Sequence, residues 1–147
     1  MNLLVIGHVT EIHGPVQALE TYLKNQKADF VMVKHNLLGG SPISYFSHFV
    51  KNIVSAYKIS GKVDTFIGID NLNAISGIFL KKIGKVRKVI YYVIDYTPHR
   101  FENPFLNKIY HFIEKLAARH SDYIWNISSR IQKIHAKQGI SNEKNLV

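Results

Sequence analysis

The chain has 147 residues, with no cysteine and with 19 Lys and Arg residues against 10 Asp and Glu residues, a formal net charge of +9 at pH 7. This length predicts one domain with a substantial buried core, and the lack of cysteine excludes disulfides, thiolate metal sites and a cysteine nucleophile. The excess of positive charge favours anionic partners, such as phosphorylated ligands or an acidic membrane face.

Short apolar runs alternate with helical patterns along the whole chain. Apolar runs that end at glycine or polar residues are typical of strands covered on both faces, and a proline is favoured at the first position of a helix. The predicted elements are a strand at 3–6, a helix from Pro15, a strand at 30–33, a loop at 36–42, a helix at 43–59, a strand at 65–69, a helix at 74–82, a strand at 88–94, a helix at 104–120, a strand at 123–127 and a last helix ending near residue 137. Leu146 and Val147 look like the opening of a sixth strand, so we expect the chain to be a fragment of a longer protein.

This alternation predicts an α/β fold, a Rossmann-like parallel sheet with helices on both faces, in a single domain spanning residues 1–147. We expect the common strand order 3-2-1-4-5, in which the first and fourth strands are neighbours. Ligands bind at the carboxyl ends of such strands, where the order reverses. The predicted crevice therefore lies between the loops at 7–14 and 95–103.

The loop at 7–14 contains Gly7, His8, His13 and Gly14. The free N–H groups at the start of the following helix favour an anion such as a phosphate, so these four residues are candidates for binding a diphosphate or an acceptor. A dinucleotide-binding fingerprint is not complete, because the second glycine is missing. The alternative is that Gly7 serves only the turn and Gly14 only the start of the helix.

The loop at 95–103 places Asp95, His99 and Arg100 after a buried strand. Asp95 is a candidate general base or sugar ligand, His99 a candidate hydrogen-bond donor or proton shuttle near neutral pH, and Arg100 a candidate ligand for a phosphate or carboxylate. In the alternative interpretation, Asp95 holds the loop backbone and Arg100 pairs with Glu102.

Lysines cluster at Lys81, Lys82 and Lys85 and along the helix predicted at 43–59, which also carries aromatic residues. A basic helix with aromatics is able to lie on an anionic bilayer, although we favour core packing for its apolar stripe. We predict no nucleic-acid partner, metal or cofactor, because no module or ligand spacing for them is present. No signal peptide or spanning segment is found, which predicts a cytoplasmic protein, soluble or peripheral at the membrane.

The segment from Tyr91 to Ser129 resembles the N-terminal half of group 1 glycosyltransferases of the GT-B architecture. The resemblance rests on Asp-Tyr-Thr-Pro-His-Arg-Phe from residue 95, Asn-Lys-Ile-Tyr from residue 107 and Ser-Asp-Tyr-Ile-Trp-Asn-Ile-Ser-Ser from residue 121. Two positions depart from the family pattern: Gly14-Pro15 stands where the family often has two glycines, and Arg100 stands where it often has aspartate.

The resemblance implies a retaining transfer of a sugar from a nucleotide-sugar donor to a glycan or lipid-linked acceptor, which is often at a membrane. It implies that this domain binds mainly the acceptor, while a C-terminal domain absent from this chain holds the nucleotide, so residues 1–147 alone should be inactive. It also implies that Gly14 approaches the donor diphosphate and that His99 contacts the donor sugar, with Asp95 on the acceptor side. The alternatives are a stand-alone module that binds a phosphorylated ligand and a basic membrane-docking domain.

Overall fold

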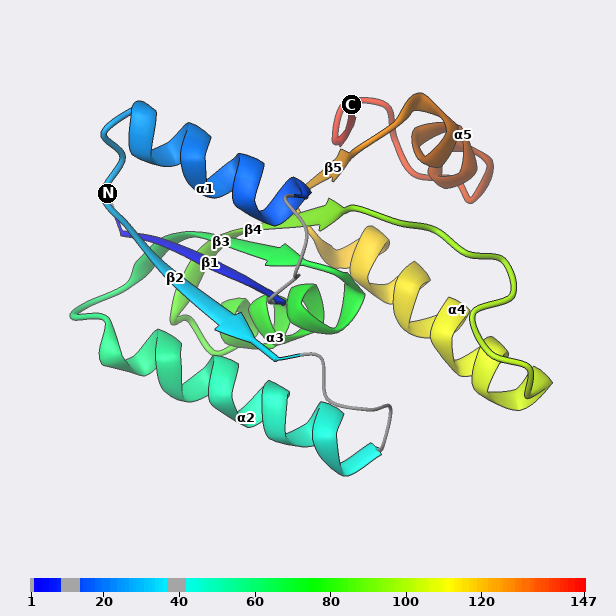
Figure 1. Cartoon of the computed structure of the whole chain (residues 1–147), viewed down its shortest axis with the longest axis horizontal. Coiled ribbons are helices and arrows are strands. Elements are labelled where there is room, and N and C mark those ends of the chain that lie inside the picture. The colour runs from blue at the N-terminus through cyan, green and yellow to red at the C-terminus, as the bar shows by residue number, and fades with distance from the viewer. Residues whose placement is uncertain (1, 9–13, 37–41) are drawn as a thin grey trace.

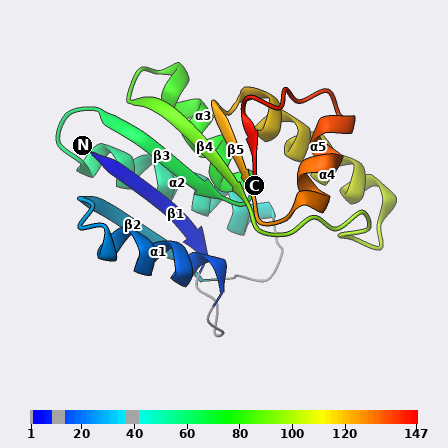
Figure 2. The ribbon, with the colours of Figure 1, turned by 90° about the horizontal axis from the view of Figure 1, so that it is seen from above.

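The computed structural model describes residues 2–8, 14–36 and 42–147, in which six parallel strands form one sheet in the order β2-β1-β3-β4-β5-β6 (Figure 2). The elements are β1 (Leu3–His8), α1 (Pro15–Asn25), β2 (Phe30–His35), α2 (Pro42–Lys58), β3 (Val63–Ile69), α3 (Asn71–Lys82), β4 (Val86–Val93), α4 (Pro104–His120), β5 (Tyr123–Asn126), α5 (Ser129–Lys137) and β6 (Asn145–Leu146). The predicted α/β, Rossmann-like class is confirmed.

The predicted strand order is wrong in one respect that matters for the site. β1 pairs with β2 on one side and with β3 on the other, with Leu4 opposite Phe66, so β3 separates β1 from β4. After β2, the chain crosses back over β1 through α2 and continues outward strand by strand. The order therefore reverses between β1 and β3, which is where a ligand-binding crevice is expected in such a sheet.

Helices cover both faces of the sheet, as predicted, but unequally. α1 covers one face with Val16 and Leu23, which pack with Leu3, Val5 and residues of β3 and β4. On the other face, α2 and α3 cover β1, β3 and β4, while α3, α4 and α5 enclose a second group around β4 and β5. Figure 1 shows α1 on one side of the sheet and α2 and α3 on the opposite side.

Two glycines bring α3 close to the strand beneath it. A Cβ atom on Gly68 of β3 would lie 2.5 Å from the backbone nitrogen of Ala74, and one on Gly77 of α3 would lie 2.4 Å from Cδ1 of Phe66. Neither site has room for a larger residue without movement of buried atoms. These glycines therefore fix the height of α3 above the sheet, and with it the position of its N-terminus.

Local capping explains why α4 begins where the sequence predicts. The side chain of Asn103 accepts hydrogen bonds from the backbone N–H groups of Phe105 (2.9 Å) and Leu106 (3.3 Å), and Pro104 occupies the first helical position. Such a cap satisfies amides that the helix leaves unpaired. α5 likewise begins after Ser128, whose hydroxyl accepts from the N–H of Ile131 at 3.4 Å.

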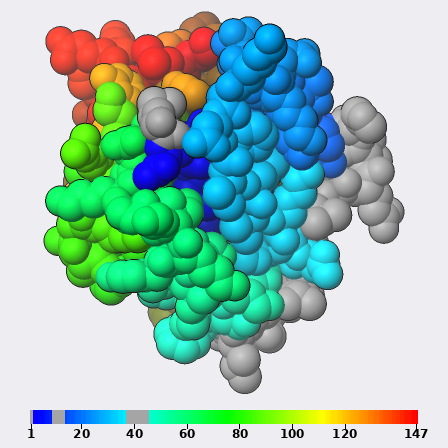
Figure 3. Space-filling view, turned by 90° about the vertical axis from the view of Figure 1, so that its left-hand side faces the viewer, coloured from blue at the N-terminus to red at the C-terminus, as the bar shows by residue number. Residues whose placement is uncertain are grey.

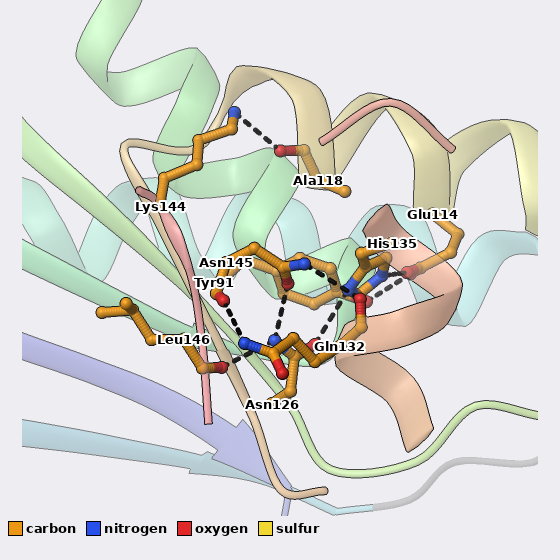
Figure 4. Close-up of polar contacts among 9 residues, drawn as sticks. All are labelled: Tyr91, Glu114, Ala118, Asn126, Gln132, His135, Lys144, Asn145 and Leu146. Carbon is orange, nitrogen blue, oxygen red and sulfur yellow. Dashed lines mark hydrogen bonds and ion pairs between the residues drawn. The ribbon is translucent and has the colours of Figure 1, made fainter. Parts of the chain in front are cut away.

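A buried polar network joins α4 and α5 to the last two strands (Figure 4). The Tyr91 hydroxyl donates to Glu114, whose other carboxyl oxygen lies 2.7 Å from Nε2 of His135. Nδ1 of His135 lies 2.8 Å from Oδ1 of Asn126, whose amide donates to the carbonyl of Leu146 at 2.7 Å. Burial, followed by the charge of Glu114 and the hydrogen bond to it, raises the pKa of Tyr91.

The network determines where its protons lie. The carbonyl of Leu146 accepts only, so the NH₂ group of Asn126 faces it and Oδ1 of Asn126 faces His135. Nδ1 of His135 must therefore donate, and one further proton is shared between Nε2 and Glu114. The amide of Asn126 also donates to Oδ1 of Asn145 at 2.8 Å. Because Asn145 and Leu146 form β6, this network anchors the last strand to the core.

Candidate functional site

The carboxyl ends of three neighbouring strands, β1, β2 and β3, bring together His8, His35 and Asp70. Nδ1 of His8 lies 3.1 Å from Oδ2 of Asp70, with side-chain exposures of 16% and 30%. The two residues are 62 positions apart in the chain and meet because β1 and β3 are adjacent. Figure 3 shows the opposite end of the molecule, where the strands begin. There, the start of β1 has α1 and β2 on one side and the segment that joins α2 to β3 on the other.

The backbone of Asp70 is strained. Its φ of 76° and ψ of 157° lie in a region that is essentially restricted to glycine and that costs about 1–3 kcal/mol. Asp70 directly precedes α3, yet its carboxylate makes no capping bond to that helix and faces His8 instead. The N–H of Asp70 donates to the carbonyl of Tyr92 in β4 at 3.2 Å. The strained backbone thus aims the carboxylate at His8, at the carboxyl ends of β1 and β3.

A layer of buried polar side chains supports this pair. The rings of His35 and His48 stack with their centroids 4.6 Å apart, and the ring of His48 is centred 5.8 Å from that of His8. Asn52 of α2 donates to Oδ1 of Asn73 and to Oγ of Ser76, both at 3.0 Å, so its own Oδ1 accepts from Nε2 of His35. Burial, more than the neighbouring charges, lowers the pKa of His35 and of His48.

A small cavity of about 40 Å³ opens beside these side chains, lined by His8, His48, Phe49, Asn52, Leu72, Asn73 and Ile75. Asn73 is itself fixed by a 2.7 Å bond from its amide to the carbonyl of Ile69. Asn52 and Asn73 are therefore held in place by hydrogen bonds, while Phe49, Leu72 and Ile75 supply apolar lining.

The His8–Asp70 pair has the chemistry of a proton acceptor. An ionised carboxylate only accepts hydrogen bonds, so Nδ1 of a neutral His8 donates to Asp70, and its Nε2 keeps a lone pair that no other described residue is shown to bind. A carboxylate that fixes the imidazole tautomer in this way prepares the ring to take a proton from a hydroxyl group.

The second predicted loop is organised differently from what the sequence suggests. Arg100 pairs with Asp95 at 2.5 Å, with side-chain exposures of 43% and 50%, and not with Glu102 as the alternative interpretation had it. Burial alone would lower the pKa of Arg100, but the bond and charge of Asp95 outweigh it and raise that pKa. The guanidinium also lies 5.8 Å from the ring centre of Tyr110.

Helix α4 holds the loop backbone in place. Oδ1 of Asn107 accepts from the N–H of Arg100 (2.9 Å) and Phe101 (3.2 Å), and its amide donates to the carbonyl of Pro98 at 3.0 Å. Nε2 of His111 lies 2.8 Å from the same carbonyl. His99 is exposed beside these contacts. The loop thus presents the Asp95–Arg100 pair and His99 at the carboxyl edge of β4.

The glycines of the first predicted loop have structural contacts of their own. A Cβ atom on Gly7 would lie 3.0 Å from Cδ1 of Ile69 and 3.5 Å from Cγ1 of Val16, so Gly7 leaves room for these two side chains. The N–H of Gly14 donates to Oε1 of Gln17 at 3.1 Å, so this amide is bonded within the start of α1. His13 lies outside the described residues.

Among the residues gathered here, the sequence identifies His8 as a candidate site residue but does not identify Asp70, His35, His48, Asn52 or Asn73. The available signal was the polar pair at Asp70 and Asn71 after a buried strand, which matches the arrangement at Asp95. The assumed strand order directed attention to the loop after β4 instead.

A separate groove of about 540 Å³ runs between β2 and α2, lined by Val33, Lys34, His35, Asn36, His48, Val50, Lys51, Val54, Ser55 and Lys58. Lys34 forms an ion pair with Glu20, whose pKa is lowered by hydrogen bonds to Lys24 and Lys34. Lys51 and Lys58 are exposed, so the groove carries positive charge.

Within the described residues, no cluster of three or more histidine and acidic side chains is arranged to hold a metal ion, and no helix is long and apolar enough to cross a membrane. No protein-family model matches the chain, and a search of curated proteins finds no match either.

Proposed function

We propose that this chain is the acceptor-binding domain of a glycosyltransferase that moves a sugar from a nucleotide-sugar to a glycan or lipid-linked acceptor. The observation that supports the proposal most strongly is the His8–Asp70 pair at the reversal point of the sheet. A sugar acceptor reacts through a hydroxyl group, and a tautomer-fixed imidazole suits that group.

In this proposal, Nε2 of His8 binds the acceptor hydroxyl and takes its proton as the oxygen bonds to the anomeric carbon and the nucleotide diphosphate departs. Asp70 is a positioning residue that fixes the His8 ring. Asp95 and Arg100 hold the neighbouring loop, and His99 contacts the donor sugar from it, as the resemblance implies. Retention of the anomeric configuration, which the resemblance implies, requires the acceptor oxygen to bond to the anomeric carbon on the same face from which the diphosphate departs.

The proposal assigns the nucleotide mainly to a second domain. Gly7 and Gly14 are committed to packing and to a helix start in this chain, which supports a minor role for this domain in holding a diphosphate. We therefore expect residues 1–147 to bind an acceptor without turning over a nucleotide-sugar.

The test is an NMR titration of ¹⁵N-labelled chain with short-chain polyprenyl-phosphate sugars, free oligosaccharides and nucleotide-sugars. We expect an acceptor to shift the amides of His8, Asp70 and Asn73, and His8→Gln to abolish those shifts. Glu143→Gln, an exposed change in the turn before β6, is the matched control. Shifts confined to other regions, or none with any sugar, would contradict the proposal.

The second candidate function is a stand-alone module that binds a phosphorylated ligand, which the basic groove between β2 and α2 favours. The same titration separates the two candidates. Inorganic phosphate and nucleotides should shift the amides of Lys51 and Lys58 if the groove is the binding site, and sugars without phosphate should not.

A further inference from the structure

An apolar stripe runs along the exposed side of α2. Phe49, Ile53 and Ala56 face the core or neighbouring helix, as the sequence predicts for the whole stripe. A second set of large apolar side chains, spaced three or four residues apart, is exposed instead: Phe46 (69%), Val50 (42%), Val54 (49%) and Tyr57 (58%). The apolar surface of α2 therefore extends beyond the side of the helix that packs against the core.

α4 repeats this feature in the same helical layer. Its inward side carries buried Glu114, Ala117 and Ala118, while the opposite side exposes Phe105 (69%), Ile109 (40%) and Phe112 (63%). Positions 105, 109 and 112 share one helix face. Between α2 and α4, α3 exposes Phe79, and Ile83 follows at its end.

Within α2, α3 and α4 the exposed charges have one sign, whereas Asp95 and Glu102 are exposed in the loop before α4. Glu114 is the one acidic residue in the sequences of α2, α3 and α4, and it is buried. The exposed cations that flank the stripes are Lys51, Lys58, Lys82, Lys108, Lys115 and Arg119. Two lysines of the basic cluster emphasised by the sequence are less available, because Lys81 pairs with Asp122 at 2.5 Å and Lys85 donates to the carbonyl of Ile59 at 2.9 Å.

We propose that this outer face of α2, α3 and α4 docks on an anionic lipid bilayer. Apolar and aromatic side chains at the centre of a helix face, with lysines at its flanks, match the acyl boundary and the anionic headgroups of a bilayer surface. Lysine is depleted in protein–protein interfaces, so the composition favours a bilayer over a protein partner. This proposal of bilayer docking does not depend on the proposed glycosyltransferase function.

The experiment is co-sedimentation of the whole chain with phosphatidylcholine vesicles, either pure or containing phosphatidylglycerol. Lys51→Glu with Lys58→Glu tests the charges on α2, and Phe105→Ser with Phe112→Ser tests the apolar stripe on α4. The matched controls lie on the α1 side of the sheet: Lys24→Glu with Lys88→Glu for charge, and Tyr22→Ser, at 59% exposure, for an exposed aromatic. Circular dichroism establishes that each variant is folded.

We expect the unaltered chain to bind the anionic vesicles, with affinity that falls as salt rises. Each test pair should weaken this binding by about tenfold or more, and the controls should bind within about twofold of the unaltered chain. Lack of binding by the unaltered chain, equal binding to neutral vesicles, or equal losses in test and control variants would overturn the proposal. Binding to a protein partner that the same variants abolish, without vesicle binding, would also overturn it.

Discussion

Replacing Glu114 tests the proton arrangement of the buried network. Glu114 is 1% exposed, and its two carboxyl oxygens serve Tyr91 (2% exposed) and His135 (0% exposed). Glu114→Ala leaves the Tyr91 hydroxyl without its acceptor and Nε2 of His135 without its hydrogen-bond partner, each costing about 1–3 kcal/mol. Removing one member of a buried pair costs about 3–5 kcal/mol in total, a large part of the 5–15 kcal/mol that is typical for a domain.

Glu114→Gln should be far milder, for a reason specific to this network. Nδ1 of His135 must donate to Asn126, so neutral His135 offers the lone pair of Nε2 to the glutamine NH₂ group, while the glutamine oxygen still accepts from Tyr91. Every bond is retained, and we expect a loss below about 1.5 kcal/mol, the net contribution of one hydrogen bond.

The assay is urea unfolding at neutral pH, monitored by circular dichroism, with Glu143→Gln as an exposed control expected to lie within about 0.5 kcal/mol of the unaltered chain. If Glu114→Gln destabilises as much as Glu114→Ala, or if Glu114→Ala costs less than about 1 kcal/mol, the proton assignment is wrong.

Two further predictions concern the core and the histidines behind the site. Gly77→Ala places a Cβ atom 2.4 Å from the ring of buried Phe66, so urea unfolding should show a net loss of about 1–3 kcal/mol despite the better helix propensity of alanine; a stabilised variant would refute the packing argument. Burial lowers the pKa of His35 and His48 in the folded chain, so the unfolded chain binds more protons as the pH falls below 6.5, the ordinary histidine value. The stability that these neutral histidines contribute is fully present above pH 6.5 and is lost as the pH falls through their lowered pKa values. Unfolding free energies measured at steps from pH 7.5 to 5 should therefore fall, with a shallower slope in the double variant His35→Gln and His48→Gln; equal slopes would contradict this assignment.

Local sequence features predict the elements well. Asn103 and Pro104 define the start of α4, Ser128 defines the start of α5, and the short apolar runs locate the strands. These features act over a few residues, so they are readable from the chain. The two residues at the end, predicted to open a sixth strand, coincide in part with β6.

The features that the sequence does not predict depend on contacts between residues that are far apart in the chain. Nothing local to residues 3–8 distinguishes β3 from β4 as the neighbour of β1, and the pairing of His8 with Asp70 depends on that choice. The apolar residues of α2 occupy more than one face of the helix, so the sequence alone does not identify which of them pack in the core. Asp95 and Arg100, predicted to face a ligand, pair with each other, which requires the loop conformation that Asn107 fixes.

The most direct test of the central claim is calorimetric affinity for a sugar acceptor, measured for the unaltered chain, His8→Gln and His99→Gln. If the crevice between β1 and β3 binds the acceptor, His8→Gln should weaken binding by about tenfold or more, roughly the loss of one hydrogen bond to a buried polar group. His99→Gln should leave it nearly unchanged. A loss with His99→Gln and none with His8→Gln would contradict the account and return the site to the loop after β4.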